Sequence, residues 1–330
     1  MFFNRQKTAL PPQQLYIVRR MDMSKTMLLF SGQGSQYVGM GKELYESSEG
    51  ARAIAKTACE VLGRDICTIM FEGTAEELAL TVNSQPAIML CSLMALECAK
   101  EKGLKFDGVA GHSLGEYAAL AASGMVSVQD GFRLIKARAE AMQKAAETSS
   151  GAMYAIIGPT PQEIETACEK TEGYVVPVNY NSPVQTVIAG ESAAAEAAAK
   201  MISETSTAKR VKVVKLNVAS AFHSEIMRPA ADEFLEAAKT VTFAAPNCEF
   251  YSNVLGEKLS DFSQMPQMLA KHIVSPVKFT SELAQMQQAG YTDYIELGPG
   301  KVLTGLVKKT LDGVRAVNVE NVETLAKAFE

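Results

Sequence analysis

Paired cysteines, zinc-type histidine spacings and long apolar runs are all missing from this sequence. Its six cysteines are scattered without a C-x-x-C pair, and none of the three histidines is spaced to complete a zinc site with them, so we expect no metal. Most of these cysteines have apolar neighbours, as buried free thiols do, which indicates a reducing compartment and a cytoplasmic protein. No apolar run reaches the ~18 residues of a membrane span, so we expect no membrane association.

An excess of positive charge is also missing. The chain has 32 basic and 37 acidic residues, a formal net charge of -5 and a pI near 5.5. Binding to nucleic acid needs a basic field, so we expect no nucleic-acid partner. With 330 residues and 47% hydrophobic content, the chain is long and apolar enough for one large domain with an insert, or for two domains.

The most informative stretch present is Gly111-His-Ser-Leu-Gly-Glu-Tyr117, which has the pattern G-x-S-x-G. Residues 106–110 before it predict a short strand, and residues 117–122 after it predict a helix. Glycines two positions before and after a serine allow a tight strand-to-helix turn that exposes the hydroxyl to a base and to N–H donors. Ser113 is therefore a candidate nucleophile, although a bare G-x-S-x-G also occurs in ordinary loops.

Periodicity predicts an α/β architecture around this turn. Residues 27–30 form an expected strand that runs into a glycine-containing loop, where α/β sheets place their sites. Apolar spacing over residues 40–100 predicts helices, the second of them starting at Gln85-Pro86. Residues 151–216 predict the order β-α-β-β-α-β, which is a ferredoxin-like unit.

We therefore expect a hydrolase-like large α/β domain with a central parallel sheet, formed by residues 27–150 and 217–330. A ferredoxin-like βαββαβ subdomain over residues 151–216 is inserted into it. Residues 1–26 are expected to be a disordered leader, because Pro11-Pro12 and similar interruptions break any period and no secretory signal is present. A docking or targeting arm is the alternative interpretation of that leader.

A single arginine interrupts an apolar stripe in the helix expected after Ser127. Steps of three and four residues place Ile135, Arg138 and Met142 on one face. A guanidinium facing the interior needs an anion, because an unpaired buried charge is strongly destabilising. That anion is either a carboxylate of the protein itself or a bound acid, unless the side chain extends to solvent.

A base for Ser113 must accept a proton near neutral pH, which favours histidine. Only His112, His223 and His272 are available. His112 adjoins the nucleophile, where the turn should direct its side chain elsewhere. His223 lies between the expected insert and a helix predicted over 225–238, and it is the candidate base; a hydrogen-bonded structural histidine is the alternative.

Together these segments resemble the malonyl-CoA:acyl carrier protein transacylase family over about residues 27–320. The motifs that match, in chain order, are Ser31-Gly-Gln-Gly-Ser-Gln36, the Ser113 heptapeptide, the Leu134, Arg138, Met142 and Gln143 pattern, Asn179 to Pro183, the segment from Ser220 to Ala231 and Glu296 to Leu303.

The resemblance implies ping-pong acyl transfer through a malonyl ester of Ser113, with His223 as the base. It assigns the backbone N–H groups of Gln33 and Leu114 to the oxyanion hole, and Arg138 to the free carboxylate of malonyl. Ser31 replaces the usual proline of the first motif. Residues expected to line the cleft or to support it are His112, Asn179, Asn181, Phe222 and His272.

Two of these assignments have simple alternatives. Turn chemistry explains Asn179 and Asn181 equally well. At His272 most members carry a glutamine whose backbone carbonyl orients the catalytic histidine. We therefore expect His272 to leave the chemistry unchanged, although two charged imidazoles in one pocket would repel each other.

The implied substrates are malonyl-CoA and the 4'-phosphopantetheine arm of holo acyl carrier protein, with no bound cofactor, and we expect a monomer. The implied pathway is fatty acid synthesis; a discrete acyltransferase of a polyketide synthase is one alternative. A serine thioesterase or hydrolase and a non-catalytic binding module are the others. Carrier proteins of this kind are acidic, and the candidate contacts are Lys209, Arg210, Lys212 and Lys215, although a solvated strand edge also explains such a run.

Overall fold

The computed structural model describes residues 24–330; residues 1–23, which make up most of the predicted leader, lie outside the described residues. Strand β1 (Lys25–Phe30) begins two residues before the strand expected from the sequence. Within residues 24–330, no helix has both the length and the apolar character needed to cross a bilayer.

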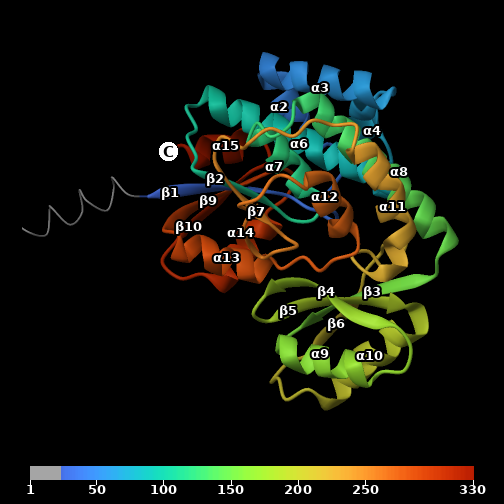
Figure 1. The fold of residues 1–330 in the computed structure, drawn as a ribbon. Helices are drawn as coiled ribbons and strands as arrows, with labels where there is room; N and C mark the ends of the chain where they lie inside the picture. The colour runs from blue at the N-terminus through green and yellow to red at the C-terminus, as the bar shows by residue number, and fades with distance from the viewer. Residues whose placement is uncertain (1–23) are drawn as a thin grey trace, which may run out of the picture.

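Six strands form the central sheet of the larger unit (Figure 1). Five of them are parallel, and only the last edge strand is antiparallel to its neighbour. This confirms the expected α/β fold with a mostly parallel central sheet. The spatial order is β10 (Arg315–Val319), β9 (Tyr291–Leu297), β1, β2 (Gly108–Gly111), β7 (Glu249–Ser252) and β8 (Glu257–Lys258).

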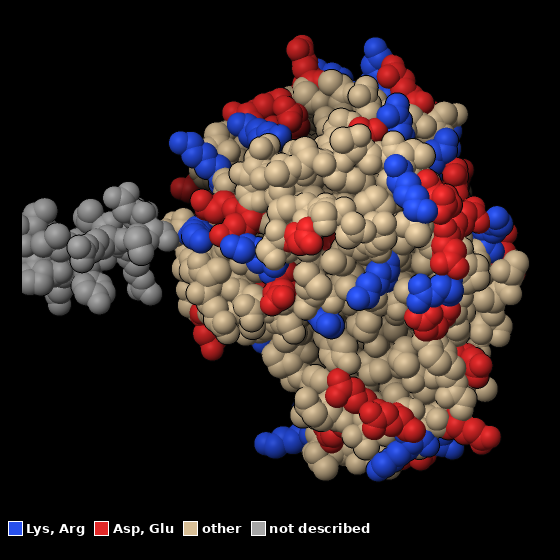
Figure 2. All heavy atoms as spheres, viewed as in Figure 1, with Lys and Arg blue, Asp and Glu red and all other residues tan. Residues whose placement is uncertain are grey.

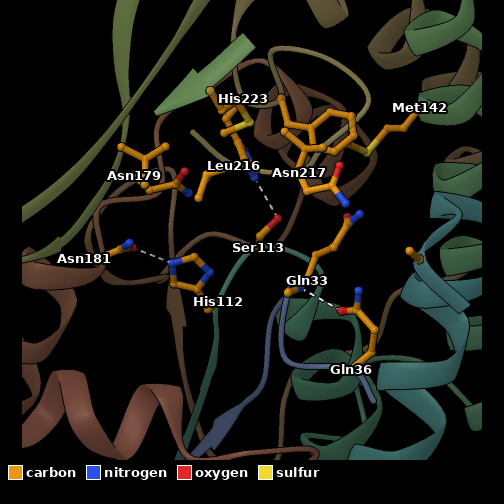
Figure 3. Close-up of a pocket in the computed structure, with 16 residues that line it drawn as sticks. Gln33, Gln36, His112, Ser113, Met142, Asn179, Asn181, Leu216, Asn217 and His223 are labelled. Atoms are coloured by element: carbon orange, nitrogen blue, oxygen red, sulfur yellow. Dashed lines mark hydrogen bonds between the residues drawn. The ribbon is translucent and has the colours of Figure 1, made fainter. Parts of the chain in front are cut away.

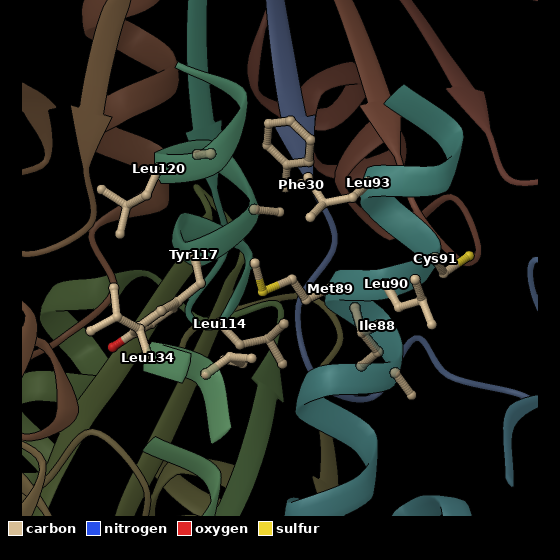
Figure 4. Close-up of a cluster of buried hydrophobic side chains, with 14 of the residues drawn as sticks. Phe30, Ile88, Met89, Leu90, Cys91, Leu93, Leu114, Tyr117, Leu120 and Leu134 are labelled. Carbon is tan, nitrogen blue, oxygen red and sulfur yellow. The ribbon is translucent and has the colours of Figure 1, made fainter. Parts of the chain in front are cut away.

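Helices cover both faces of this sheet, because a parallel sheet is buried on both sides. Strand β1 shows the alternation: Leu28 and Phe30 belong to the larger core cluster, and Met27 and Leu29 to the smaller one on the opposite face. The larger cluster includes Phe30, Met89 and Tyr117, which are among the side chains drawn in Figure 4. The helices of this unit are α2 (Lys42–Ser47), α3 (Glu49–Leu62), α4 (Ile66–Glu72), α5 (Ala75–Ala79), α6 (Thr81–Glu101), α7 (Gly115–Ala122), α8 (Val128–Thr148), the 3-10 turn η1 (Glu225–Met227), α11 (Arg228–Ala238), α12 (Met265–Ile273), α13 (Phe279–Gln288), α14 (Val302–Thr310) and α15 (Val322–Ala328).

A smaller antiparallel unit lies below the large one in Figure 1. Its strands lie in the order β4-β5-β3-β6, and its two helices cover one face, which matches the expected ferredoxin-like insert. Met153 and Ala155 on the other face join the core of the large unit. The elements are β3 (Gly151–Ile157), α9 (Pro161–Lys170), β4 (Val175–Ser182), β5 (Gln185–Glu191), α10 (Ser192–Thr205) and β6 (Lys212–Lys215).

The helix start predicted at Gln85-Pro86 is wrong. Helix α6 begins at Thr81 and contains Pro86 in its interior. A proline there leaves the carbonyl four residues earlier without its helical donor. The Arg64 guanidinium donates to that carbonyl, on Val82, so a contact from the α3–α4 loop satisfies the group that proline leaves free.

Candidate active site

Ser113 lies in the tight turn between β2 and α7, as the glycine spacing predicts. Its backbone is left-handed, with φ 54°, a conformation that non-glycine residues rarely adopt. A Cβ on Gly111 would lie 2.0 Å from the Gly115 carbonyl carbon, and one on Gly115 would lie 2.1 Å from the Phe30 carbonyl oxygen. Both positions therefore require glycine, and the turn holds the hydroxyl at the wall of a cavity.

Ser113 and His223 meet across this cavity (Figure 3). Ser113 Oγ lies 2.7 Å from His223 Nε2. The other ring nitrogen, Nδ1, lies 3.0 Å from the carbonyl of His272 and 3.2 Å from that of Ser275. Because carbonyls only accept hydrogen bonds, we assign the proton to Nδ1, which leaves Nε2 free to accept the Ser113 proton.

The surroundings of His223 favour its neutral form. Burial lowers the pKa of His223 well below its ordinary value, and the positive charges that His272 and Arg138 can carry lower it further. The hydrogen bond to the His272 carbonyl opposes these effects only in part. An imidazole that stays neutral near physiological pH is ready to act as a base.

Arg138 extends from α8 toward the same hydroxyl. Its Nη2 donates to Ser113 Oγ over 3.2 Å, and its guanidinium lies over the Tyr117 ring at 5.5 Å from the ring centroid. The side chain is 1% exposed, and its Nε has no hydrogen-bond partner among the described residues. No carboxylate of residues 24–330 lies within ion-pair distance; Glu116 acts on it only from farther away.

Arg138 is therefore a buried cation without an anion of its own. Of the three options open at the sequence level, the structure excludes a salt bridge within residues 24–330 and an extension to solvent. Arg133, on the same helix, shows the ordinary alternative: it is exposed and pairs with Asp130 at 2.7 Å. A bound acid is the option that the structure leaves open, although Arg138 itself is not among the residues that line the cavity.

The cavity beside Ser113 has a volume of about 410 Å³ and lies between the large unit and the small one. Gln33, on the loop after β1, forms part of its wall, and the Leu114 N–H lies at the start of α7, where helix N–H groups lack helical acceptors. The lining residues are Gln33, Gly34, Gln36, Ala79, His112, Ser113, Met142, Met153, Asn179, Asn181, Val187, Leu216, Asn217, Val218, Phe222 and His223.

Four of the five residues expected around the cleft thus line it, namely His112, Asn179, Asn181 and Phe222. His112 Nε2 lies 2.8 Å from Asn181 Oδ1, so this ring is engaged by the small unit and not by Ser113 (Figure 3). His272 does not line the cavity. It is fully buried, its carbonyl faces His223 as expected, and its ring centroid lies 5.4 Å from that of His223.

Sequence reasoning missed three buried polar residues behind the turn. Asn253 Oδ1 accepts a hydrogen bond from Ser113 N over 2.7 Å, and Asn253 Nδ2 donates to Glu282 Oε1 over 2.7 Å. Glu116 accepts from the Asn253 backbone N–H. Glu116 could have been noticed in the sequence, because it is an acidic residue within an otherwise apolar helix. No sequence pattern distinguishes Asn253 or Glu282.

One group of possible metal ligands occurs within residues 24–330, and it lies outside the cavity lining. Cys59, Asp65 and Cys67 bring their ligand atoms within 4.8 Å of one another. Asp65 Oδ1 accepts from the N–H groups of Cys67 and Thr68, and its Oδ2 accepts from the Thr68 hydroxyl. These contacts identify Asp65 as the cap of α4, so we assign no cofactor to the cluster.

Comparisons with known proteins identify the family of this chain. The acyl transferase domain family matches residues 27–327. The chain is 39% identical to the malonyl CoA-acyl carrier protein transacylase of Bacillus subtilis, over 93% of this chain and 97% of that protein. Among solved structures it is similar to the malonyl CoA-acyl carrier protein transacylase of Clostridium perfringens, with TM-score 0.87 and 36% identity over 92% of this chain and 96% of that one. It is also similar to a malonyl-transacylase in complex with a type II PKS acyl-carrier protein, with TM-score 0.88 and 34% identity over 93% of this chain and 99% of that one.

Proposed function

This chain belongs to the acyl transferase family, and we propose that it transfers the malonyl group from malonyl-CoA to the phosphopantetheine thiol of a holo acyl carrier protein. The observation that carries this proposal is Arg138, a buried guanidinium that contacts the Ser113 hydroxyl and pairs with no carboxylate among the residues that the structure describes. A guanidinium presents two parallel N–H donors, and the free carboxylate of a malonyl group can accept a hydrogen bond from each of them.

The first half-reaction uses the Ser113–His223 pair. His223 Nε2 takes the hydroxyl proton while Ser113 Oγ attacks the thioester carbonyl of malonyl-CoA. The backbone N–H groups of Gln33 and Leu114 bind the oxyanion. When the carbon–sulfur bond breaks, the proton on His223 passes to the leaving thiolate, and coenzyme A departs as the thiol.

The second half-reaction reverses these roles with a different thiol. The phosphopantetheine thiol gives its proton to His223 and attacks the malonyl ester. The ester bond breaks, and Ser113 Oγ recovers the proton from His223. The products are the malonyl thioester of the carrier and the free enzyme.

A hydrolase is the main rival, because water could attack the same ester. The serine hydrolases with a Ser-His-acid triad orient the imidazole with a carboxylate. Here His223 Nδ1 faces two backbone carbonyls, those of His272 and Ser275. This arrangement, together with the unpaired Arg138, favours transfer of a dicarboxylic acyl group.

Strand β6 is the proposed approach for the carrier. Lys209, Arg210, Lys212 and Lys215 are all exposed, and residues 216–218, which follow directly, line the cavity. Acidic and basic side chains lie side by side on the face of the small unit seen in Figure 2. We therefore expect an acidic carrier to be attracted by these four basic residues and not by an extended basic surface. An acidic carrier bound along β6 would place its arm at the cavity, and fatty acid synthesis is the process we propose that it serves.

The pH dependence of kcat/KM is predicted to reflect the displaced pKa of His223. The base must be neutral, and its pKa is lowered, so activity should remain on its plateau at pH 6.5 and fall only at lower pH. Initial rates with malonyl-CoA between pH 4.5 and 8 would measure this limb. A midpoint at or above the ordinary histidine value of 6.5 would contradict the environment described for His223.

The proposed function is tested by following a radiolabelled malonyl group. Malonyl-CoA labelled in the malonyl moiety is mixed with the protein, and holo carrier protein is added afterwards. Transfer predicts label on Ser113 that moves to the carrier. Free malonate would instead indicate a hydrolase, and the absence of any labelled protein would indicate a binding module.

A further inference from the structure

Two residues in the described chain combine a side chain with a left-handed backbone, and they are the proposed nucleophile and base. Ser113 has φ 54° and His223 has φ 62°; every other positive φ among residues 24–330 belongs to glycine. A left-handed backbone is unfavourable for residues that carry a Cβ, so surrounding contacts must hold it in place. At Ser113 the structure shows which contacts those are.

Asn253 holds the nucleophile from behind. Its Oδ1 accepts from Ser113 N over 2.7 Å, and its Nδ2 donates to the Gly111 carbonyl over 2.7 Å. One side chain thus bonds to the backbone on both sides of the tight turn. Asn253 is 0% exposed and is not among the residues that line the cavity, and its side chain bonds to the backbone of the turn.

Glu116 and His272 extend this contact to the base. Glu116 accepts from Asn253 N through Oε1, and its Oε2 lies 3.2 Å from His272 Nδ1. The contact between Glu116 and His272 is close enough for an ion pair, but it does not have the geometry of a hydrogen bond. The carbonyl of the same His272 accepts from His223 Nδ1. A continuous chain of buried contacts therefore joins Ser113 to His223.

On the basis of the function proposed above, we propose that Asn253 and Glu116 are positioning residues. With the His272 side chain they form one buried network that holds the Ser113 backbone in its left-handed conformation and the His223 ring in place beside the Ser113 hydroxyl. The network acts on the rate of acyl transfer, and substrate binding does not depend on it.

Glu282 completes the network by limiting its charge. Burial raises the pKa of Glu282 well above its ordinary value, and the nearby Glu116 raises it further. The protonated form is thereby favoured, so Asn253 Nδ2 can donate to Glu282 Oε1 without placing a second full charge beside Glu116. In this form Glu282 adds no charge to the buried network.

The test is the rate of Ser113 malonylation, measured by rapid quench with radiolabelled malonyl-CoA. Asn253→Ala is expected to lower this rate constant about 100-fold, as misplacement of a reacting group by about 1 Å does. The half-saturating concentration of malonyl-CoA should stay within about threefold of wild type. Wild-type protein that takes no label would refute the proposed function itself, which separates that failure from failure of the network.

The matched control is Asn83→Ala. Asn83 is also buried, and its Nδ2 donates to the Glu77 carbonyl, but it does not contact the network. It should acylate within about twofold of wild type. A folded Asn253→Ala protein that acylates within about threefold of wild type, or one that changes only the half-saturating concentration, would overturn the proposal.

A pair of substitutions at His272 keeps the proposal testable if Asn253→Ala does not fold. His272→Leu and His272→Gln both keep the backbone carbonyl that faces His223, but only glutamine keeps a polar side chain that can face Glu116. We expect acylation to slow about tenfold in His272→Leu and to recover to within threefold of wild type in His272→Gln. Equal rates in the two variants, with equal thermal unfolding midpoints, would exclude a positioning role for this side chain.

Discussion

Ser113→Ala is expected to lower malonyl transfer about 10⁴-fold or more and to abolish covalent labelling, because the variant has no hydroxyl to form the ester. His223→Ala should produce a loss of similar size, since no other base lies within hydrogen-bond distance of Ser113 Oγ among the described residues. Steady-state transfer to holo carrier protein, together with retention of radiolabel on the denatured enzyme, measures both effects.

The pair should act as a unit. Ser113 Oγ and His223 Nε2 are 2.7 Å apart, and residues in one catalytic contact show strongly non-additive losses. The double variant should therefore be no slower than either single variant within about threefold. If the rate reductions of the two single variants multiply in the double variant, His223 does not act on the Ser113 hydroxyl.

Ser84→Ala is the matched control for the serine substitution. Ser84 is fully buried, and its Oγ has no hydrogen-bond partner in the described chain. It should transfer malonyl within about twofold of wild type. Stable labelling of Ser113→Ala would identify a different nucleophile, and undiminished transfer without labelling would replace the ping-pong mechanism by direct attack of the carrier thiol.

Arg138→Ala is expected to reduce transfer of malonyl by about 10² to 4 × 10³-fold, while transfer of an acetyl group from acetyl-CoA falls much less. Loss of a buried charge pair costs roughly 3–5 kcal/mol, and each 1.4 kcal/mol corresponds to a factor of ten. Acetyl has no carboxylate to pair with the guanidinium. The ratio of kcat/KM for the two acyl-CoA substrates is the measurement, because any general effect on Ser113 cancels in it.

Two further arginine variants sharpen this test. Arg138→Lys keeps a positive charge but loses the paired N–H donors of the guanidinium. Its preference for malonyl should therefore lie between those of wild type and Arg138→Ala. Arg133→Ala, which removes an exposed arginine of the same helix, should leave the ratio unchanged. Equal loss of both acyl transfers in Arg138→Ala would show that Arg138 supports Ser113 without binding the acyl carboxylate.

Folding stability provides an independent check on Arg138. A buried cation without an anion is destabilising, so Arg138→Met should unfold at the same temperature as the wild type or at a higher one. Loss of malonyl transfer by a protein of undiminished stability would show that the arginine is retained for function.

Local features were predictable from the sequence because they depend on neighbouring residues alone. The turn at Ser113 follows from the two glycines, since any Cβ at those positions meets backbone atoms of α7 and β1. The βαββαβ order of the small unit follows from apolar periodicity, and it was predicted correctly. The buried face of α8, with Ile135, Arg138 and Met142, follows from helical spacing in the same way.

Tertiary structure decided everything that depends on segments far apart in the chain. Ser113 and His223 are 110 residues apart, and no local pattern shows that their side chains meet; family resemblance supplied that pairing. Asn253 lies 140 residues from the backbone N–H it binds, and an asparagine before a turn has no distinguishing local signal. Pro86 was misjudged for the same reason, since the donor that satisfies the Val82 carbonyl comes from another loop.

The charge state of the site was also beyond the sequence. Periodicity placed Arg138 on a buried face, but whether a carboxylate met it there depended on which helices and strands pack around α8. Desolvation and neighbouring charges act through space, so the lowered pKa of His223 and the raised pKa of Glu282 arise only when the chain is folded. The sequence determined which side chains are present and which face of each helix or strand is buried. The tertiary structure determined which of those side chains lie close enough to interact.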